Sequence, residues 1–220
     1  MEPNLPLNLK ITLTVACVVL LIAACARRGS QPPATSQNRV LTAPTGASVA
    51  AEPEDGQWPM PAKNYASTRF SGLQDINTSN VGSLKLAWSF STGVVRGHEA
   101  APIVANNTMY IVTPYPNIVY ALDLTRVGGP LKWKYESNPA SSSQGVACCD
   151  VVNRGMVYSD GRVFFNTLDG NTIALDANTG QLVWKTKVAD INLGESITMA
   201  PLVVKGKVLV GNSGGEFGVR

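Results

Sequence analysis

The residues best suited to chemistry in this chain are two adjacent cysteines, Cys148 and Cys149, and an arginine that follows them closely, Arg154. An arginine offers a fixed positive charge and paired hydrogen bonds, which suit a carboxylate on a small ligand. Reduced, buried cysteines that act as small apolar side chains are common in proteins. The cysteine pair alone therefore does not establish a site, and its meaning depends on the segments around it.

A second group of candidate residues lies close to the last residue of the sequence. Glu216 could supply oxygen ligands to a cation such as Ca²⁺, although a single acidic residue in a turn is more often solvated. Gly214 and Gly215 have no side chains, so their backbone could approach a ligand closely. His98 is the only histidine, and because a lone imidazole is more often structural, we assign it no part in catalysis.

Short β-rich segments separated by turns must position these residues, because no sustained helical period follows Trp58. Segments 101–134 and 161–185 share one pattern, in which an Ala-Leu-Asp strand, a glycine-containing turn and a Trp-containing strand follow one another, and a third copy begins at 200–210. In such a turn the Asp can bond its local backbone, and Gly can adopt the positive φ that reverses the chain. A short helical turn is expected within 77–84.

Three tryptophans mark the period of this repeat. Trp88, Trp133 and Trp184 recur about every 50 residues, a spacing typical of β-propeller blades with four antiparallel strands. Each ring offers a large flat surface for packing on a neighbouring blade. The sequence therefore predicts an all-β fold of about two and a half to three blades, with a generic β-sandwich as the alternative. Since a blade buries its faces only against its neighbours, the outermost faces and edges should be exposed and favour aggregation.

Composition and the N-terminal segment indicate the remaining organisation. The chain of 220 residues is 45% hydrophobic and 15% charged, as in globular proteins, and its net charge of +3 without a basic stripe gives no support for nucleic-acid binding. The apolar run 11–26 is shorter than a spanning helix normally needs, so residues 1–25 are predicted to be an export signal. Residues 26–56, rich in Pro, Ser, Thr, Ala and Gly, are predicted to form a disordered tether before a propeller at 57–220.

The end of the apolar run, Leu-Ile-Ala-Ala-Cys at 21–25, resembles the lipobox of bacterial lipoproteins. This resemblance implies a periplasmic protein that is anchored to a membrane through a lipid on Cys25. An ordinary signal peptide and an uncleaved anchor are the alternatives.

Segment 174–184, Ala-Leu-Asp-Ala-Asn-Thr-Gly-Gln-Leu-Val-Trp, resembles the tryptophan-docking repeat of the PQQ-dependent quinoprotein alcohol dehydrogenases, of the methanol and ethanol dehydrogenase type. Stretches at 58–71, 86–102, 148–155, 195–201 and 211–220 are similar to further parts of that family, so the resemblance extends from Trp58 to Arg220. It implies the N-terminal part of an eight-bladed quinoprotein β-propeller. Because propellers without enzymatic activity share the repeat, the repeat alone indicates a fold and not a reaction.

The resemblance also implies a set of residues that contact or orient PQQ: Glu99, Cys148, Cys149, Arg154, Thr198, Ser213, Gly214 and Gly215. Cys148 and Cys149 would form the disulfide between neighbouring cysteines that lies against one face of the quinone in this family. Such a bond requires an oxidising compartment, which agrees with export. Arg154 would meet a PQQ carboxylate, and Glu216 would be a ligand of the metal.

The implied reaction is the oxidation of a primary alcohol to an aldehyde, with hydride passing to C5 of PQQ, Ca²⁺ or a lanthanide ion acting as Lewis acid and an aspartate as base. Electrons would pass to a periplasmic cytochrome c, and the full-length protein could form a homodimer. The aspartate and further metal ligands are expected beyond Arg220, so residues 1–220 alone should be inactive. The alternative is a lipid-anchored propeller scaffold of the outer-membrane assembly type, which binds proteins and needs no quinone-sized polar pocket.

Overall fold

The structure is a computed structural model, and it describes residues 54–147, 150–215 and 218–219. Antiparallel strands dominate these residues, and no helix among them is long and apolar enough to cross a membrane. Among the described residues, short 3₁₀ helices occur outside the strands: η1 (Val81–Ser83), η2 (Ser141–Gly145) and η3 (Ile191–Leu193). Helix η1 lies within the segment for which the sequence predicts a helical turn, whereas η2 and η3 had no counterpart in the sequence analysis.

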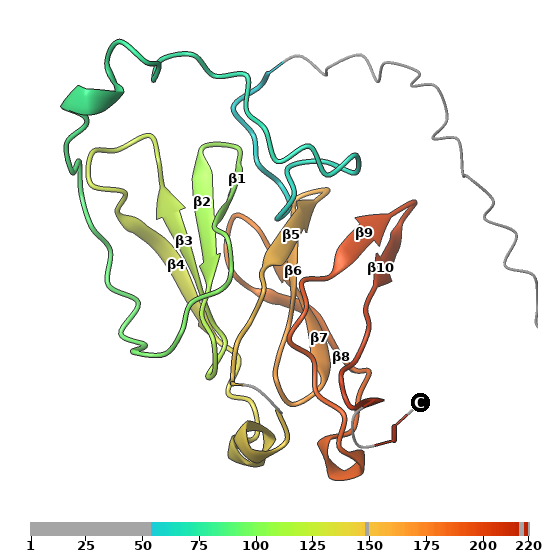
Figure 1. Cartoon of the computed structure of the whole chain (residues 1–220). Helices are drawn as coiled ribbons and strands as arrows, with labels where there is room; N and C mark the ends of the chain where they lie inside the picture. Colours follow the sequence, from blue (N-terminus) through green and yellow to red (C-terminus); the bar gives the residue numbers. More distant parts are fainter. Residues whose placement is uncertain (1–53, 148–149, 216–217, 220) are drawn as a thin grey trace, which may run out of the picture. The chain divides into compact units, whose positions relative to one another are not determined.

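Two complete four-stranded sheets and one hairpin follow each other along the chain (Figure 1). The first sheet contains β1 (Ile103–Ala105), β2 (Thr108–Val112), β3 (Ile118–Asp123) and β4 (Leu131–Glu136). The second sheet contains β5 (Met156–Ser159), β6 (Arg162–Asn166), β7 (Asn171–Asp176) and β8 (Leu182–Lys187). The hairpin consists of β9 (Leu202–Val204) and β10 (Lys207–Leu209).

Each sheet is an antiparallel meander in which the strand order equals the chain order. Strand β1 lies close to β5, and β5 lies close to β9, so the first strands of consecutive sheets are neighbours, as they are around a propeller axis. Trp58 extends the first sheet beyond β1, because its backbone exchanges hydrogen bonds of 2.7 and 3.0 Å with Val104. This arrangement confirms the predicted all-β fold of two blades and part of a third.

Two segments differ from the strands that the sequence predicts. The segment around Trp88 pairs with no strand among the described residues, although Trp88 marks the period of the repeat. Strand β5 was not predicted, because its four residues are too few to show alternation. A strand exists only through pairing, which a local pattern cannot guarantee.

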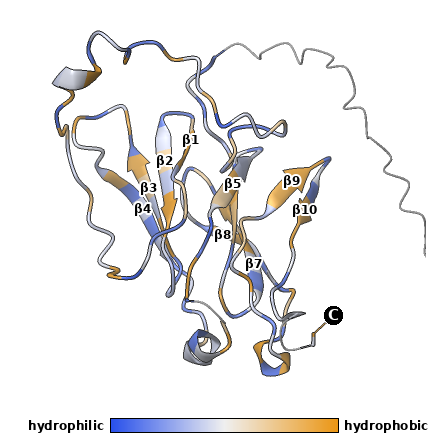
Figure 2. Ribbon diagram, viewed as in Figure 1, coloured by the Kyte–Doolittle hydropathy of each residue, from blue (hydrophilic) through white to orange (hydrophobic). Residues whose placement is uncertain are grey.

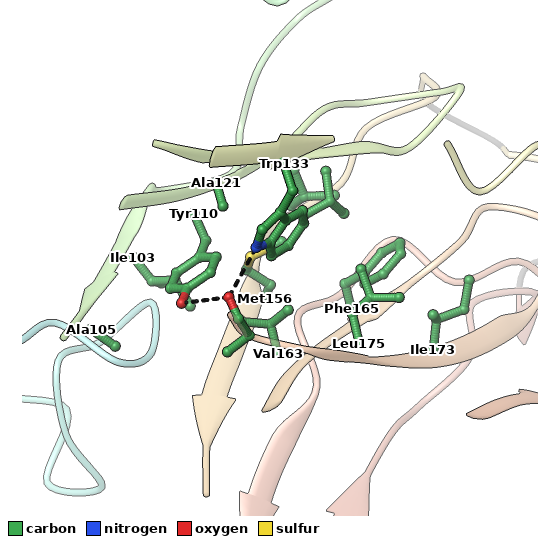
Figure 3. Close-up of a cluster of buried hydrophobic side chains, with 13 residues drawn as sticks. Ile103, Ala105, Tyr110, Ala121, Trp133, Met156, Val163, Phe165, Ile173 and Leu175 are labelled. Atoms are coloured by element: carbon green, nitrogen blue, oxygen red, sulfur yellow. Dashed lines mark hydrogen bonds between the residues drawn. The ribbon is translucent and has the colours of Figure 1, made fainter. Parts of the chain in front are cut away.

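Packing between the first and second blades forms the main core. Its members come from both sheets and include Ile103, Val119, Phe165 and Leu175, none of which is exposed to solvent. At the centre, the indole Nε1 of Trp133 and the hydroxyl of Tyr110 both donate hydrogen bonds to the Ala177 carbonyl, at 3.0 and 3.1 Å (Figure 3). These two bonds join the first blade to the turn that follows β7 in the second.

The tryptophan rings pack on glycines, as the predicted docking repeat requires. A Cβ on Gly180, which has a φ of +73°, would lie 2.6 Å from the Trp133 ring. The same contact occurs one blade earlier, where a Cβ on Gly129 would lie 3.0 Å from the Trp88 ring. Trp133 is 8% exposed, and it is the only residue of β4 that is buried. In both contacts the tryptophan ring of one repeat lies against a glycine of the next repeat, where no side chain is present.

The outer strand of the second blade is open to solvent. No residue of β8 is fully buried, and Leu182 and Val183 are 50% and 44% exposed. Figure 2 shows apolar residues, coloured orange, along β9 and part of β10, where Leu209 is 46% exposed. The predicted exposure of apolar edges is confirmed, and the predicted tendency to aggregate stays a prediction.

Glu54, the first described residue, lies within the range 26–56 that is predicted to form a tether, and its carboxylate makes several hydrogen bonds. One carboxylate oxygen of Glu54 accepts hydrogen bonds from Lys63 Nζ at 3.0 Å and the Gly56 amide at 2.8 Å. The other oxygen accepts from Ser71 Oγ at 2.9 Å and the Gly72 amide at 2.5 Å. The bond from Lys63, helped by the other three, lowers the pKa of Glu54 to about 2. Glu54 thus fastens the start of the folded unit to segment 63–72.

Acidification should release this contact in a defined window. Because the pKa is lowered in the folded state, the contribution of Glu54 to stability is present above about pH 4.5 and is lost as the pH falls towards about 2. We expect the Gly56 and Gly72 amides to lose protection in that window, measured by hydrogen exchange relative to intrinsic rates. In Glu54→Gln the protection should be weak at every pH, whereas Glu136→Gln, at an exposed ion pair, should behave as wild type. If amide protection in Glu54→Gln depended on pH as it does in wild type, this assignment would be contradicted.

Candidate cofactor-binding site

Arg154 lies in a short loop that is fixed on both sides before β5 begins. The Asn153 side chain is buried, and its Oδ1 accepts a hydrogen bond of 2.9 Å from the Gly155 amide. Gly155 has a φ of +130°, and a Cβ at this position would lie 3.0 Å from Pro61 Cγ. The loop therefore needs Asn and Gly around the arginine, and it leaves the Arg154 side chain 52% exposed.

Three of the predicted cofactor residues meet at the Arg154 guanidinium. Its Nε lies 3.2 Å from Glu99 Oε2, and its Nη1 donates to Thr198 Oγ1 at 2.6 Å. The Arg154 backbone amide also donates to the Thr198 carbonyl at 2.9 Å. These residues come from the segment before β1, the loop before β5 and the segment before β9. The first strands of successive sheets are neighbours, which explains why the three segments converge.

The guanidinium retains donors for a ligand. An arginine has five N–H donors, and within the described part of the chain Glu99 and Thr198 occupy one each. The ion pair is half exposed on both sides, since 52% of the Arg154 side chain and 48% of the Glu99 side chain are accessible. An exposed pair of this kind adds about 0–1 kcal/mol to stability, so a ligand carboxylate can compete for the arginine.

The loop that carries Glu99 is attached to the first blade. The Tyr120 hydroxyl donates to the Thr92 carbonyl at 2.7 Å, and the Phe90 ring packs edge-on against the Tyr120 ring. His98 Nε2 lies 3.1 Å from the Val94 carbonyl, within the same loop. These contacts agree with a structural role for His98, because its ring nitrogen is engaged in holding the loop in shape.

The loop also lies next to the residue that follows the cysteine pair. A Cβ on Gly97 would be 3.8 Å from Asp150 Oδ2. Cys148 and Cys149 themselves lie outside the described residues, and so does Glu216. Their assigned roles therefore stay predictions. Within the described ranges, no group of three His, Cys, Asp or Glu residues is arranged to hold a metal ion.

Ser213 is held beside the segment that carries Thr198. Ser213 and the buried Ser196 form an antiparallel bridge, with backbone hydrogen bonds of 2.7 and 3.3 Å. Gly214 follows with a φ of +128°, and a Cβ there would lie 2.7 Å from the Gly194 carbonyl. Gly215 differs, because no atom of the described residues lies within 4 Å of the position that its Cβ would take. The fold itself therefore requires glycine at position 214, whereas Gly215 leaves an open backbone surface.

This combination of donors fits a flat ligand that carries carboxylates. A half-exposed guanidinium supplies positive charge and N–H groups, and the Thr198 hydroxyl is held against it at 2.6 Å. Ser213 lies on the segment that is bridged to Ser196, two residues before Thr198. Such groups recognise carboxylates by charge-assisted hydrogen bonds, so the described residues agree with the cofactor class that the resemblance implies.

Comparison with a family profile shows to which protein family the chain belongs. The profile is that of the PQQ family, described as the β-propeller domain of glucose/ethanol/alcohol dehydrogenases, and it matches residues 58–216. The chain belongs to the PQQ-dependent alcohol dehydrogenase family. This assignment confirms the resemblance and the quinoprotein β-propeller fold that it implied.

Individual relatives of this dehydrogenase chain agree with the assignment. It is 60% identical to the lanthanide-dependent methanol dehydrogenase of Methylacidiphilum fumariolicum (strain SolV) over 172 residues, or 78% of this chain and 28% of that protein. It is 47% identical to methanol dehydrogenase [cytochrome c] subunit 1 of Methylorubrum extorquens over 178 residues, again 78% of this chain and 28% of that protein.

A solved structure gives the same result for the fold. The europium-containing methanol dehydrogenase superposes with a TM-score of 0.73 at 62% identity, and the match covers 74% of this chain and 28% of that one. The dehydrogenase chain described here thus spans just over a quarter of the length of the relatives that it matches.

Proposed function

We propose that this chain is part of a PQQ-dependent dehydrogenase that oxidises primary alcohols to aldehydes and passes electrons to a periplasmic cytochrome c. The observation that carries the proposal is the meeting of Arg154, Glu99 and Thr198 at one half-exposed guanidinium, in a chain of this family. The named relatives are methanol dehydrogenases, one of them with cytochrome c in its name. We therefore propose a small primary alcohol as substrate.

In this proposal the residues of the chain bind and orient the cofactor. Arg154 neutralises a carboxylate of PQQ, and the bond between Arg154 Nη1 and Thr198 Oγ1 directs the remaining guanidinium donors. Glu99 fixes the guanidinium from the other side. The hydroxyl of Ser213 and the backbone of Gly214 and Gly215 line the same ligand. PQQ, when bound, supplies the two-electron oxidant for the alcohol.

The metal is proposed to be Ca²⁺ or a lanthanide ion, with Glu216 as a ligand. A carboxylate supplies at most two oxygens, whereas Ca²⁺ takes about six to eight, so further ligands and the catalytic aspartate are assigned to chain outside residues 1–220. The higher identity to the lanthanide-dependent relative, 60% against 47%, makes a lanthanide the first metal to test.

Export and anchoring belong to the same proposal. A bond between Cys148 and Cys149 would lie against the cofactor plane and would need an oxidising compartment. The N-terminal signal would supply the route to it, and a lipid on Cys25 would hold the protein at the membrane. The full-length enzyme could work as a homodimer.

Activity assays on two lengths of chain test the proposal. The full-length protein, reconstituted with PQQ and either Ca²⁺ or La³⁺, should reduce an artificial electron acceptor when a primary alcohol is added. Residues 26–220 alone should give no turnover, because the aspartate and most metal ligands are missing. A full-length protein that oxidises no alcohol under these conditions, or turnover by residues 26–220, would overturn the proposal.

The scaffold alternative is not favoured. A propeller that only binds proteins needs no positively charged, hydroxyl-lined group of residues at its axis, yet Arg154 and Thr198 are held together in this way. The two relatives named above, at 60% and 47% identity, are methanol dehydrogenases. A third relative, at 45% identity over 78% of this chain, is a quinohemoprotein alcohol dehydrogenase.

A further inference from the structure

Asn166, at the end of β6, has a buried side chain. The residue bonds both to the loop that carries Arg154 and to the segment that carries Thr198. It is fully buried, and its backbone carbonyl accepts a hydrogen bond of 2.9 Å from Asn153 Nδ2, on the arginine loop. Its own Nδ2 donates to the Met199 carbonyl at 2.9 Å, next to Thr198. The two segments whose side chains meet at the guanidinium are thus both bonded to one residue behind it.

The orientation of Asn166 is itself determined. Thr172 Oγ1, on the neighbouring strand β7, donates to Asn166 Oδ1 at 2.8 Å. The amide nitrogen is therefore directed at Met199 and the oxygen at Thr172. Thr172 is 2% exposed and Asn153 is 1% exposed, so water does not compete for these bonds. A buried network in which every member is satisfied holds its parts in one arrangement.

Direct contact with a ligand cannot explain this residue. Asn166 has no exposed surface, and all the polar atoms of its side chain are engaged inside the protein. The bond from Asn153 uses the Asn166 backbone carbonyl and needs no particular side chain, so the amide side chain is explained by its bond to the Met199 carbonyl, next to Thr198.

We propose that Asn166 is a positioning residue for the cofactor carboxylate site, which holds the Thr198 segment in place through the Met199 carbonyl. This inference rests on the proposed function, because it assigns the purpose of that arrangement to PQQ binding. Asn166 acts through Arg154. Without the Asn166 side chain, the Thr198 segment keeps its direct bonds to Arg154 but loses the bond at Met199, so the ligand must order more of this segment when it binds.

A double-mutant cycle on the full-length apoprotein tests the inference. The dissociation constant for PQQ is measured by equilibrium dialysis for wild type, Asn166→Ala, Arg154→Met and the double variant, and the thermal midpoint of each apoprotein is recorded. Asn171→Ala is the matched control, because Asn171 is also a buried amide in this sheet but bonds to Asp169, away from the Arg154 group. Asn166→Val removes the amide donor, leaves a smaller gap than alanine and brings no charge into the buried site, so it replaces Asn166→Ala if that variant does not fold.

We expect Asn166→Ala to weaken PQQ binding by on the order of tenfold, the equivalent of about 1.4 kcal/mol. In the Arg154→Met background the same change should alter the constant by less than about twofold, since residues that act through one group are not additive. Asn171→Ala should lower the thermal midpoint and leave PQQ binding unchanged.

Three results would overturn the inference. These are an unchanged PQQ affinity in Asn166→Ala, an equal loss in both backgrounds, and an equal loss in Asn171→Ala. Equal PQQ binding by wild type and Arg154→Met would instead overturn the proposed function itself, so the two failures can be told apart.

Discussion

Replacement of Arg154 by methionine in the full-length protein is expected to weaken PQQ binding by about a hundredfold or more. Removing one partner of a buried, hydrogen-bonded charge pair costs about 2–5 kcal/mol. Bound PQQ would cover the guanidinium, and a hundredfold loss corresponds to about 2.8 kcal/mol. The variant also leaves Glu99 without the cation that lies 3.2 Å from its carboxylate. That carboxylate would then repel the anionic cofactor, which adds to the loss.

Two further variants separate charge from geometry. Arg154→Lys keeps the positive charge but loses the planar fork of donors, so it should recover only part of the affinity. Arg126→Met removes an exposed arginine in the turn after β3 and should bind PQQ as wild type does. The measurement is equilibrium dialysis of the apoprotein against PQQ. An affinity for Arg154→Met equal to that of Arg126→Met would contradict the assigned role.

Substitution of Gly180 by alanine should cause a large loss of stability. The new Cβ would lie 2.6 Å from the Trp133 ring, at a backbone φ of +73°. The φ alone costs about 1–2 kcal/mol for a residue with a side chain, and crowding of a packed core adds about 1–3 kcal/mol. The ring must move, which also weakens its hydrogen bond to the Ala177 carbonyl.

Gly161 provides the matched control for this substitution. Its φ is also +73°, but no atom lies within 4 Å of the position that its Cβ would take. Gly161→Ala should therefore show the cost of the backbone conformation without the collision, about 1–2 kcal/mol. The difference between the two variants, measured from denaturant midpoints with near-ultraviolet circular dichroism of the tryptophans, gives the cost of displacing the ring. Equal losses in both variants would show that docking of Trp133 contributes nothing at this glycine.

Repetition in the sequence made the fold predictable. Two copies of the Ala-Leu-Asp strand and its glycine turn located β3 and β7, and the tryptophans located β4 and β8, because the same local bonds recur in each blade. Strand β5 and the unpaired segment at Trp88 could not be predicted in this way. Whether a short segment becomes a strand depends on which neighbour it meets, and that is decided by contacts far along the chain.

Part of the candidate site could be predicted from the sequence because its segments resemble those of a known family. Arg154, Glu99 and Thr198 were identified through the resemblance of their segments, and the structure brings them together at one guanidinium. Asn166 was missed, since a buried amide at the end of an apolar strand has no recognisable pattern and its partners lie on separate segments. Gly214 was interpreted as a point of ligand approach, whereas its contact with the Gly194 carbonyl already requires a glycine there.

The most direct test of the central claim is an experimental structure of the full-length enzyme loaded with PQQ and its metal. We predict a cofactor carboxylate within hydrogen-bonding distance of the Arg154 guanidinium, with Thr198 and Ser213 around it and a bonded Cys148–Cys149 pair against the ring. A structure with PQQ bound away from Arg154, or with both thiols free and distant from the ring, would contradict the account.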